Sequence, residues 1–218
     1  MLQAGSELDS GERVTKNQIF TVGHSTHSLE VFASLLRLHG IEAIADVRSS
    51  PYSKRLPQFS REQLFESLCA IKVRYVYLGE LLGARRSEAS CFVGDQANYS
   101  KISQLPNFID GLDRLEAGAR KMRIALMCAE KDPLTCHRTI LVSRHLQLRG
   151  LDIFHVLDNG ELEPHPDAEH RLMLEEGFTP GQLDMFGNPD GGDTLLFAYE
   201  KRGNKIAYRR GDSDEHHD

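Results

Sequence analysis

The chain has 218 residues, of which 40% are hydrophobic and 27% are charged. This length is enough for one sizeable core, and the composition excludes a wholly disordered or membrane-embedded chain. No apolar run approaches the ~20 residues of a membrane helix, and the N-terminus has no apolar signal core, so we expect no membrane partner and no export. The net charge of −6 disfavours a global electrostatic grip on nucleic acid.

The four cysteines do not form the framework of a disulfide-stabilised protein. They lie at positions 69, 91, 128 and 136, and two of them are close to His and Arg. This pattern is typical of a reducing compartment, where thiols stay reactive or bind metal. We therefore predict a cytoplasmic location.

Short apolar segments alternate with helical patterns between residues 18 and 210, which predicts a single α/β domain. Ser28 and Gly40 fit the two ends of the first helix, and residues 60–63 form a capping box for the second. We expect strands at 19–23, 41–47, 73–78, 122–128 and 152–157, and helices at 28–40, 60–71, 106–118, 132–150 and 164–176.

This alternation predicts a parallel five-stranded sheet with helices on both faces, a three-layer arrangement of the Rossmann-like or flavodoxin-like kind. Residues 195–199 and 205–209 predict a small C-terminal hairpin. Residues 79–104 show no periodicity and predict a functional lid or a disordered excursion. Residues 1–17 are expected to form a flexible arm, and residues 211–218 a disordered acidic tail.

Polar and titratable residues follow four of the predicted strands. In a parallel sheet the carboxyl ends of the strands share one edge, where ligands bind. We therefore expect these residues to surround one cleft. They are His24 and Ser25, Asp46 and Arg48, Arg85 and Arg86, and finally Cys128, Glu130, Cys136, His137 and Arg138.

Cys136 lies where a helix is expected to begin. Free N–H groups and the helix dipole favour negative charge there, so we expect a lowered pKa and a thiolate nucleophile or ligand. The alternative is a small buried hydrophobic side chain. Arg138 at the same helix start forms an expected anion site, and Ser25, Arg48, Arg85 and Arg86 are further candidates for holding an anion.

Acid–base roles are open among four residues. Glu130 is a candidate general acid or base, or a partner that holds Arg138 or Arg48. Asp46 either orients His24 or pairs with Arg48. His24 and His137 are candidates for moving protons.

A metal site is not predicted, because eight residues separate the two cysteines and adjacent Cys and His rarely reach the same ion. The sequence indicates no particular cofactor.

Four motifs together resemble the bacterial domain-of-unknown-function family 488, over residues 19–208. The most specific is the block from Cys128 to Arg138. The others are Thr-Val-Gly-His-Ser ending at Ser25, Asp-Val-Arg-Ser-Ser-Pro starting at Asp46, and Tyr-Leu-Gly-Glu-Leu-Leu-Gly ending at Gly83. The resemblance supports the α/β fold and the cleft, and it implies no reaction.

Three functions are compatible with these residues. The first is an enzyme that acts on a small anionic or nucleotide-like molecule, with arginines holding the anion and Cys136 or Cys128 as the reactive thiol. The second is a non-catalytic module that binds phosphate or nucleic acid through the same arginines, with stacking on Tyr52, Phe59 and Tyr99. The third is a metal-dependent hydrolase.

Overall fold

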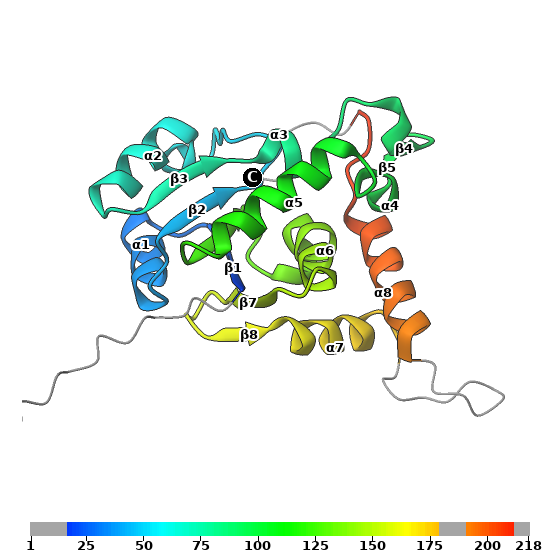
Figure 1. Ribbon diagram of the computed structural model, residues 1–218. Helices are drawn as coiled ribbons and strands as arrows, with labels where there is room; N and C mark the ends of the chain where they lie inside the picture. The colour runs from blue at the N-terminus through cyan, green and yellow to red at the C-terminus, as the bar shows by residue number, and fades with distance from the viewer. Residues whose placement is uncertain (1–16, 179–190, 212–218) are drawn as a thin grey trace, which may run out of the picture.

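The computed structural model describes residues 17–178 and 191–211 (Figure 1). The N-terminal arm and the acidic tail expected from the sequence lie almost wholly outside these residues. Among the described residues, no helix combines the length and apolar character needed to cross a membrane.

Six strands form one sheet in the order β3-β2-β6-β1-β7-β8. The first five are mutually parallel, as predicted, and β8 adds a sixth strand antiparallel to β7. β6 lies between β2 and β1, a placement found in neither of the common doubly wound orders. The strands are β1 (Gln18–Gly23), β2 (Ala43–Asp46), β3 (Arg74–Tyr77), β6 (Ile124–Cys128), β7 (Asp152–Val156) and β8 (Leu162–Pro164).

Helices cover both faces of this sheet, which confirms the predicted three-layer arrangement. Successive strand residues point to opposite faces, so Ile19 and Phe20 of β1 enter different cores. Phe20 packs with the helices α1 and α2, whereas Ile19 packs with α5, the π-helical segment η4 and α6. These helices are α1 (Leu29–Leu38), α2 (Arg61–Ala70), α5 (Pro106–Ala119), η4 (Arg138–Ser143) and α6 (Arg144–Leu148).

The C-terminal segment forms a helix where the sequence predicted a hairpin. Helix α8 (Gly191–Ile206) packs against α7 (His165–Glu175), and Tyr199 lies in a small core between them. Arg202 and Lys205, which share one face of α8, both pair with the buried Glu176, at 2.6 Å and 2.5 Å. These tertiary contacts favour a helix over the local hairpin signal.

The segment 79–104 contains short regular elements although its sequence shows no periodicity. A small antiparallel hairpin lies here, not at the C-terminus, and residues 208–210 run beside it: the Ala97 N–H donates to the Tyr208 carbonyl at 2.9 Å. Figure 1 shows α8 ending next to this hairpin. The elements are α3 (Gly79–Leu82), η2 (Ala89–Cys91), β4 (Phe92–Val93), β5 (Gln96–Ala97) and α4 (Tyr99–Ile102).

Two further short elements border the carboxyl edge of the sheet. Both are single 3₁₀ turns in the connections that follow β2 and β6. They are η1 (Pro57–Phe59) and η3 (Pro133–Thr135).

Candidate functional site

A pocket of about 850 Å³ opens at the carboxyl ends of β1, β2 and β6. Ligands of open α/β sheets bind at this edge, so its position agrees with the sequence argument. It is lined by His24, Arg48, Ser49, Ser50, Tyr52, Lys54, Arg55, Ala84, Arg85, Tyr99, Cys128, Ala129, Glu130, Thr135, His137, Lys205, Ile206 and Tyr208.

The end of β1 lies unusually close to the loop that follows β6. A Cβ atom on Gly23 would lie 2.0 Å from the Glu130 carbonyl oxygen, so only glycine fits there. The next two N–H groups, of His24 and Ser25, donate to the carbonyls of Cys128 and Ala129, both at 2.9 Å. This close approach fixes His24 and Glu130 in the walls of one pocket.

Asp46 and Arg48 form a buried pair at the end of β2. Arg48 donates to Asp46 through Nε (2.9 Å) and Nη2 (2.7 Å), and the Tyr75 hydroxyl donates to the same carboxylate at 2.8 Å. The Asp46 side chain is fully buried and does not line the pocket. Of the two roles considered from the sequence, Asp46 therefore takes the pairing role, and it presents Arg48 to the pocket.

His24 is held as a neutral ring. Its Nδ1 lies 2.9 Å from the Ser25 carbonyl and therefore donates to it, so Nε2 accepts from Arg48 Nη1 at 3.3 Å. The ring stacks on Phe59 with a centroid separation of 4.4 Å. Burial, together with the charge of Arg48, lowers the pKa of His24 to about 4. Both ring nitrogens are thus occupied, which suits a wall residue better than a proton carrier.

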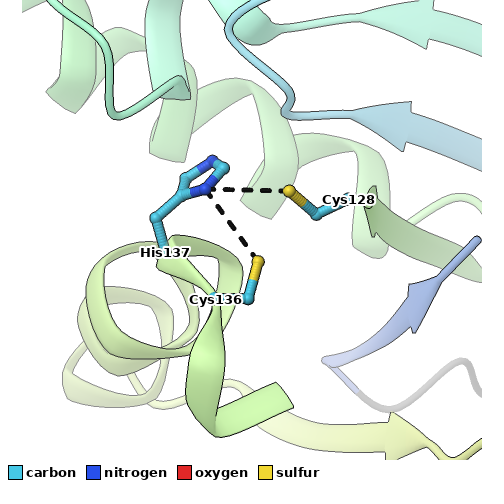
Figure 2. A group of neighbouring side chains, drawn as sticks. All are labelled: Cys128, Cys136 and His137. Carbon is cyan, nitrogen blue, oxygen red and sulfur yellow. Dashed lines mark hydrogen bonds between the residues drawn. The ribbon is translucent and has the colours of Figure 1, made fainter. Parts of the chain in front are cut away.

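Cys128, Cys136 and His137 converge at one point of the pocket wall (Figure 2). His137 Nδ1 lies 3.7 Å from Cys128 Sγ and 3.9 Å from Cys136 Sγ, and the three donor atoms lie within 4.8 Å of one another. His137 Nε2 is 2.9 Å from the Val47 carbonyl, to which it donates. This hydrogen bond leaves Nδ1 facing the two sulfur atoms.

The backbone between the two cysteines explains how adjacent side chains meet. The turn η3 folds the chain back after β6, and Cys136 is extended (φ −131°, ψ 142°) while His137 is helical (φ −62°, ψ −24°). This change of conformation directs both side chains toward Cys128. Adjacent Cys and His rarely reach the same ion, but the donor atoms of this pair both lie close to Cys128 Sγ.

Cys136 lies just before the helical segment and not, as was expected, in its first turn, and its thiol is not activated by that position. Its Sγ accepts from the Arg138 N–H at 3.3 Å. Burial nevertheless raises the pKa of Cys136 well above its usual range, and nearby Cys128 and Glu130 add to the effect. Burial also raises the pKa of Cys128. The expected lowered pKa is therefore wrong, because the helix start is enclosed and lies among other acidic groups.

Glu130 is held as a carboxylate beside both thiols. Burial alone would raise its pKa, but His137, Cys136 and Arg138 outweigh burial and lower it. Its Oε2 atom is buried and has no hydrogen-bond partner in the described part of the chain. A buried acceptor without a donor is costly, so this oxygen is available to a bound molecule or to water. We call Cys128, Cys136, His137 and Glu130 the donor cluster.

Arg138 does not face the pocket, contrary to the sequence expectation. Its side chain is fully buried and donates to the carbonyls of Glu130 (2.6 Å) and Lys131 (3.2 Å). These two hydrogen bonds brace the loop after β6, and they reach the backbone of Glu130 and not its carboxylate.

The other expected anion ligands divide between the pocket wall and its surroundings. Arg85 lines the pocket, whereas Arg86 donates to the carbonyls of Glu80 and Leu81. Ser25, at a positive φ of 47°, turns the chain and lies outside the lining.

Several residues that line the pocket were not predicted from the sequence. Lys54 and Arg55 follow β2 in the loop after Arg48, so their place after a predicted strand is the signal that marks them. Lys205 and Tyr208 reach the pocket only because α8 packs beside the 79–104 segment, and no local signal marks them. Tyr99, considered earlier only for stacking, is also a lining residue.

Comparison with known proteins agrees with the motifs at this edge. The family model described as domain of unknown function DUF488 matches residues 28–145, more than half of the chain. No curated protein and no solved structure matches the chain. The matched region includes the Asp46–Arg48 pair and the whole donor cluster. The chain therefore belongs to the DUF488 family.

Proposed function

We propose that this protein is an enzyme that acts on a small anionic molecule bound in the pocket. The observation that carries the proposal is that one pocket unites buried proton-transfer and thiol groups with a cationic lining. Cys128, Glu130 and His137 lie in its wall. Perturbed titratable groups gathered in a concave site are the usual mark of an active site.

The charge of the lining supports an anionic ligand. Five lining residues are Lys or Arg and one is acidic, although the chain as a whole carries a net charge of −6. Asp46 pairs with Arg48 and Glu176 pairs with Lys205, so the attraction comes mainly from the rest of the cationic lining, chiefly from Lys54 and Arg55. A phosphate or carboxylate group would be stabilised by such a lining.

The size of the pocket supports a small ligand. Its volume of about 850 Å³ falls in the range of small-molecule and cofactor sites, about 300–1,000 Å³. Tyr52 is exposed beside the same opening and offers an aromatic surface. A nucleotide-sized molecule would fit both the volume and the charge.

Glu130 is the best-placed group to move a proton. It is a carboxylate whose Oε2 has no hydrogen-bond partner within residues 17–178 and 191–211, whereas both nitrogens of His24 are already occupied. General acid–base catalysis requires a group within hydrogen-bond reach of the substrate.

Binding and turnover can be tested separately. Small phosphates and carboxylates, each beside a neutral analogue, would be tested for a rise in melting temperature, and then incubated with the protein and followed by mass spectrometry. We expect the Lys54→Gln/Arg55→Gln variant to weaken binding by about tenfold, one charged contact being worth roughly 1.4 kcal/mol. The matched control is Arg114→Gln/Lys121→Gln, which changes one exposed residue of α5 and one exposed residue in the turn that follows it.

Different results would contradict the anionic ligand and the enzymatic activity. Equal binding of neutral analogues would overturn the anionic ligand. Tight binding of anions that remain unchanged in mass and structure would overturn the enzyme and leave a binding module. Turnover that persists undiminished in Glu130→Gln would remove Glu130 from the chemistry.

A further inference from the structure

We infer that Cys128, Cys136 and His137 bind a zinc ion whose fourth position opens to the pocket. The site goes beyond the proposed function and stands without it, since an ion can bind whether or not the protein turns over a substrate. Its support is the geometry of three donor atoms, their burial, and the unpartnered carboxylate beside them.

The separations between the donor atoms are close to those of a tetrahedral zinc site. Zn–S bonds of about 2.3 Å and Zn–N bonds of about 2.0–2.1 Å place sulfur and nitrogen about 3.6 Å apart at tetrahedral angles. His137 Nδ1 lies 3.7 Å from Cys128 Sγ and 3.9 Å from Cys136 Sγ. Tetrahedral Zn–S bonds place the two sulfur atoms about 3.8 Å apart, and all three donor atoms lie within 4.8 Å of one another. Shifts of about 1 Å or less would therefore complete the coordination.

The histidine is already oriented as metal-bound histidines are. Its Nε2 donates to the Val47 carbonyl at 2.9 Å, so Nδ1, which faces the sulfur atoms, is the nitrogen left to bind a metal (Figure 2). A hydrogen bond from the second ring nitrogen is a regular feature of metal-bound histidine, because it fixes the tautomer and the ring orientation. Soft thiolates with one imidazole favour zinc over magnesium, calcium or manganese.

Three protein ligands with an open fourth position are typical of catalytic rather than structural zinc. Cys128 and His137 line the pocket, so the pocket gives access to that position. The Glu130 oxygens do not belong to the group of donor atoms within 4.8 Å of one another. We therefore assign Glu130 to the surroundings of the ion, where its unpartnered Oε2 accepts a hydrogen bond from zinc-bound water.

Metal binding by the full chain provides the test. The reduced, chelator-stripped protein would be titrated with Zn²⁺ against a chromophoric chelator, and with Co²⁺ in a spectrophotometer. We expect one equivalent of either metal, and for Co²⁺ thiolate charge-transfer bands with intense tetrahedral ligand-field bands. Bound zinc should protect Cys128 and Cys136 from a thiol reagent while the exposed Cys69 still reacts.

Matched variants locate the ion. Cys128→Ser and Cys136→Ser should each lower zinc affinity by at least about 100-fold, more than the loss of an outer partner costs. Cys69→Ser and the tail variant His216→Gln/His217→Gln should keep it. Glu130→Gln should keep one equivalent, with about a tenfold change or less. The wild-type cobalt spectrum and thiol protection test the site even if a cysteine variant fails to fold.

Four results would overturn the inference. The first is that protein with reduced thiols binds no metal. The second is that metal binding persists in both cysteine variants and is lost in the tail variant. The third is that a reductant, but not a chelator, makes the two thiols reactive, which indicates a disulfide. The fourth is complete loss of metal in Glu130→Gln, which would make Glu130 a ligand and close the fourth position.

Discussion

The protein contains two buried clusters built around histidine. The first is the donor cluster, and the two differ in how completely their polar atoms are hydrogen-bonded. The second cluster, which we call the histidine chain, links β1, β7, α7 and α8. Its hydrogen bonds run in one direction, from Thr21 to His155 (2.7 Å), to His165 (2.8 Å), to Tyr199 (3.0 Å) and to Glu169 (2.9 Å).

Every polar side-chain atom in the middle of the histidine chain has a partner. Both nitrogens of His155 and of His165 are used, which requires that each ring be neutral. Burial lowers the pKa of His165 to about 4, and burial also lowers the pKa of His155 well below its usual range. A network whose members are all hydrogen-bonded to one another specifies packing and leaves no donor or acceptor for a ligand.

The donor cluster has the opposite character. Its sulfur atoms and His137 Nδ1 lie within 4.8 Å of one another, Glu130 Oε2 has no hydrogen-bond partner among the described residues, and three of its four members line the pocket. Unsatisfied buried groups are costly, so they persist where function uses them. The comparison indicates that a buried histidine alone does not identify a functional site. Polar atoms beside a pocket that lack hydrogen-bond partners do identify one.

Breaking the histidine chain should cost the most stability. His155→Ala leaves Thr21 and His165 without partners and opens a cavity, so we expect a loss of about 3–5 kcal/mol in the free energy of unfolding. Urea denaturation measures it. A loss below about 1 kcal/mol would show that water replaces the ring and that the histidine chain is not a closed network.

The histidine chain should also make the fold sensitive to acid. Because the pKa of His165 is about 4 in the folded protein and 6.5 in the reference state, the unfolded chain binds the proton first. Stability should be full above about pH 7.5 and fall between about pH 6.5 and 4, by about 3 kcal/mol from His165.

His24 contributes to acid sensitivity with the same sign, since its pKa is also lowered to about 4. The contribution of His165 is therefore the difference between the wild type and His165→Gln, measured by urea denaturation at several pH values. Parallel stability curves for the two proteins would contradict the assignment.

The donor cluster should stabilise the fold only when metal is present. Zinc at about 100 times its Kd should add about 2.7 kcal/mol to the free energy of unfolding of the wild type. Cys136→Ser should lose this increment, whereas Tyr199→Phe, which alters the histidine chain, should keep it. Thermal denaturation with and without zinc measures both. An equal increment in the two variants would mean that the ion binds elsewhere.

A substitution beside the Asp46–Arg48 pair should change stability least, because Asp46 accepts several hydrogen bonds and loses only one of them. Tyr75→Phe removes one donor to Asp46 and leaves those from the Arg48 side chain, so we expect a loss of about 1 kcal/mol. Ligand binding in the pocket should change by less than about threefold. A large loss of binding would instead place Tyr75 among the residues that orient Arg48.

Much of the site was predictable because parallel strands end on a common edge. His24, Arg48, Cys128, Glu130, His137 and Arg85 all line the pocket and were all named from their positions after predicted strands. Arg138 and Arg86 were misplaced, since sequence shows that an arginine is near an edge but not which carbonyls its guanidinium reaches.

The sequence by itself determined the alternation of strands and helices, and with it the edge where polar side chains collect. Periodicity and capping are local properties, so neighbouring residues suffice to specify them. Only the tertiary structure decided that β6 lies between β1 and β2, that α8 is a helix, and that Cys136 is enclosed. Partners distant in sequence, such as Glu176 for Lys205 and Cys128 for His137, provide the contacts and the burial that set these outcomes.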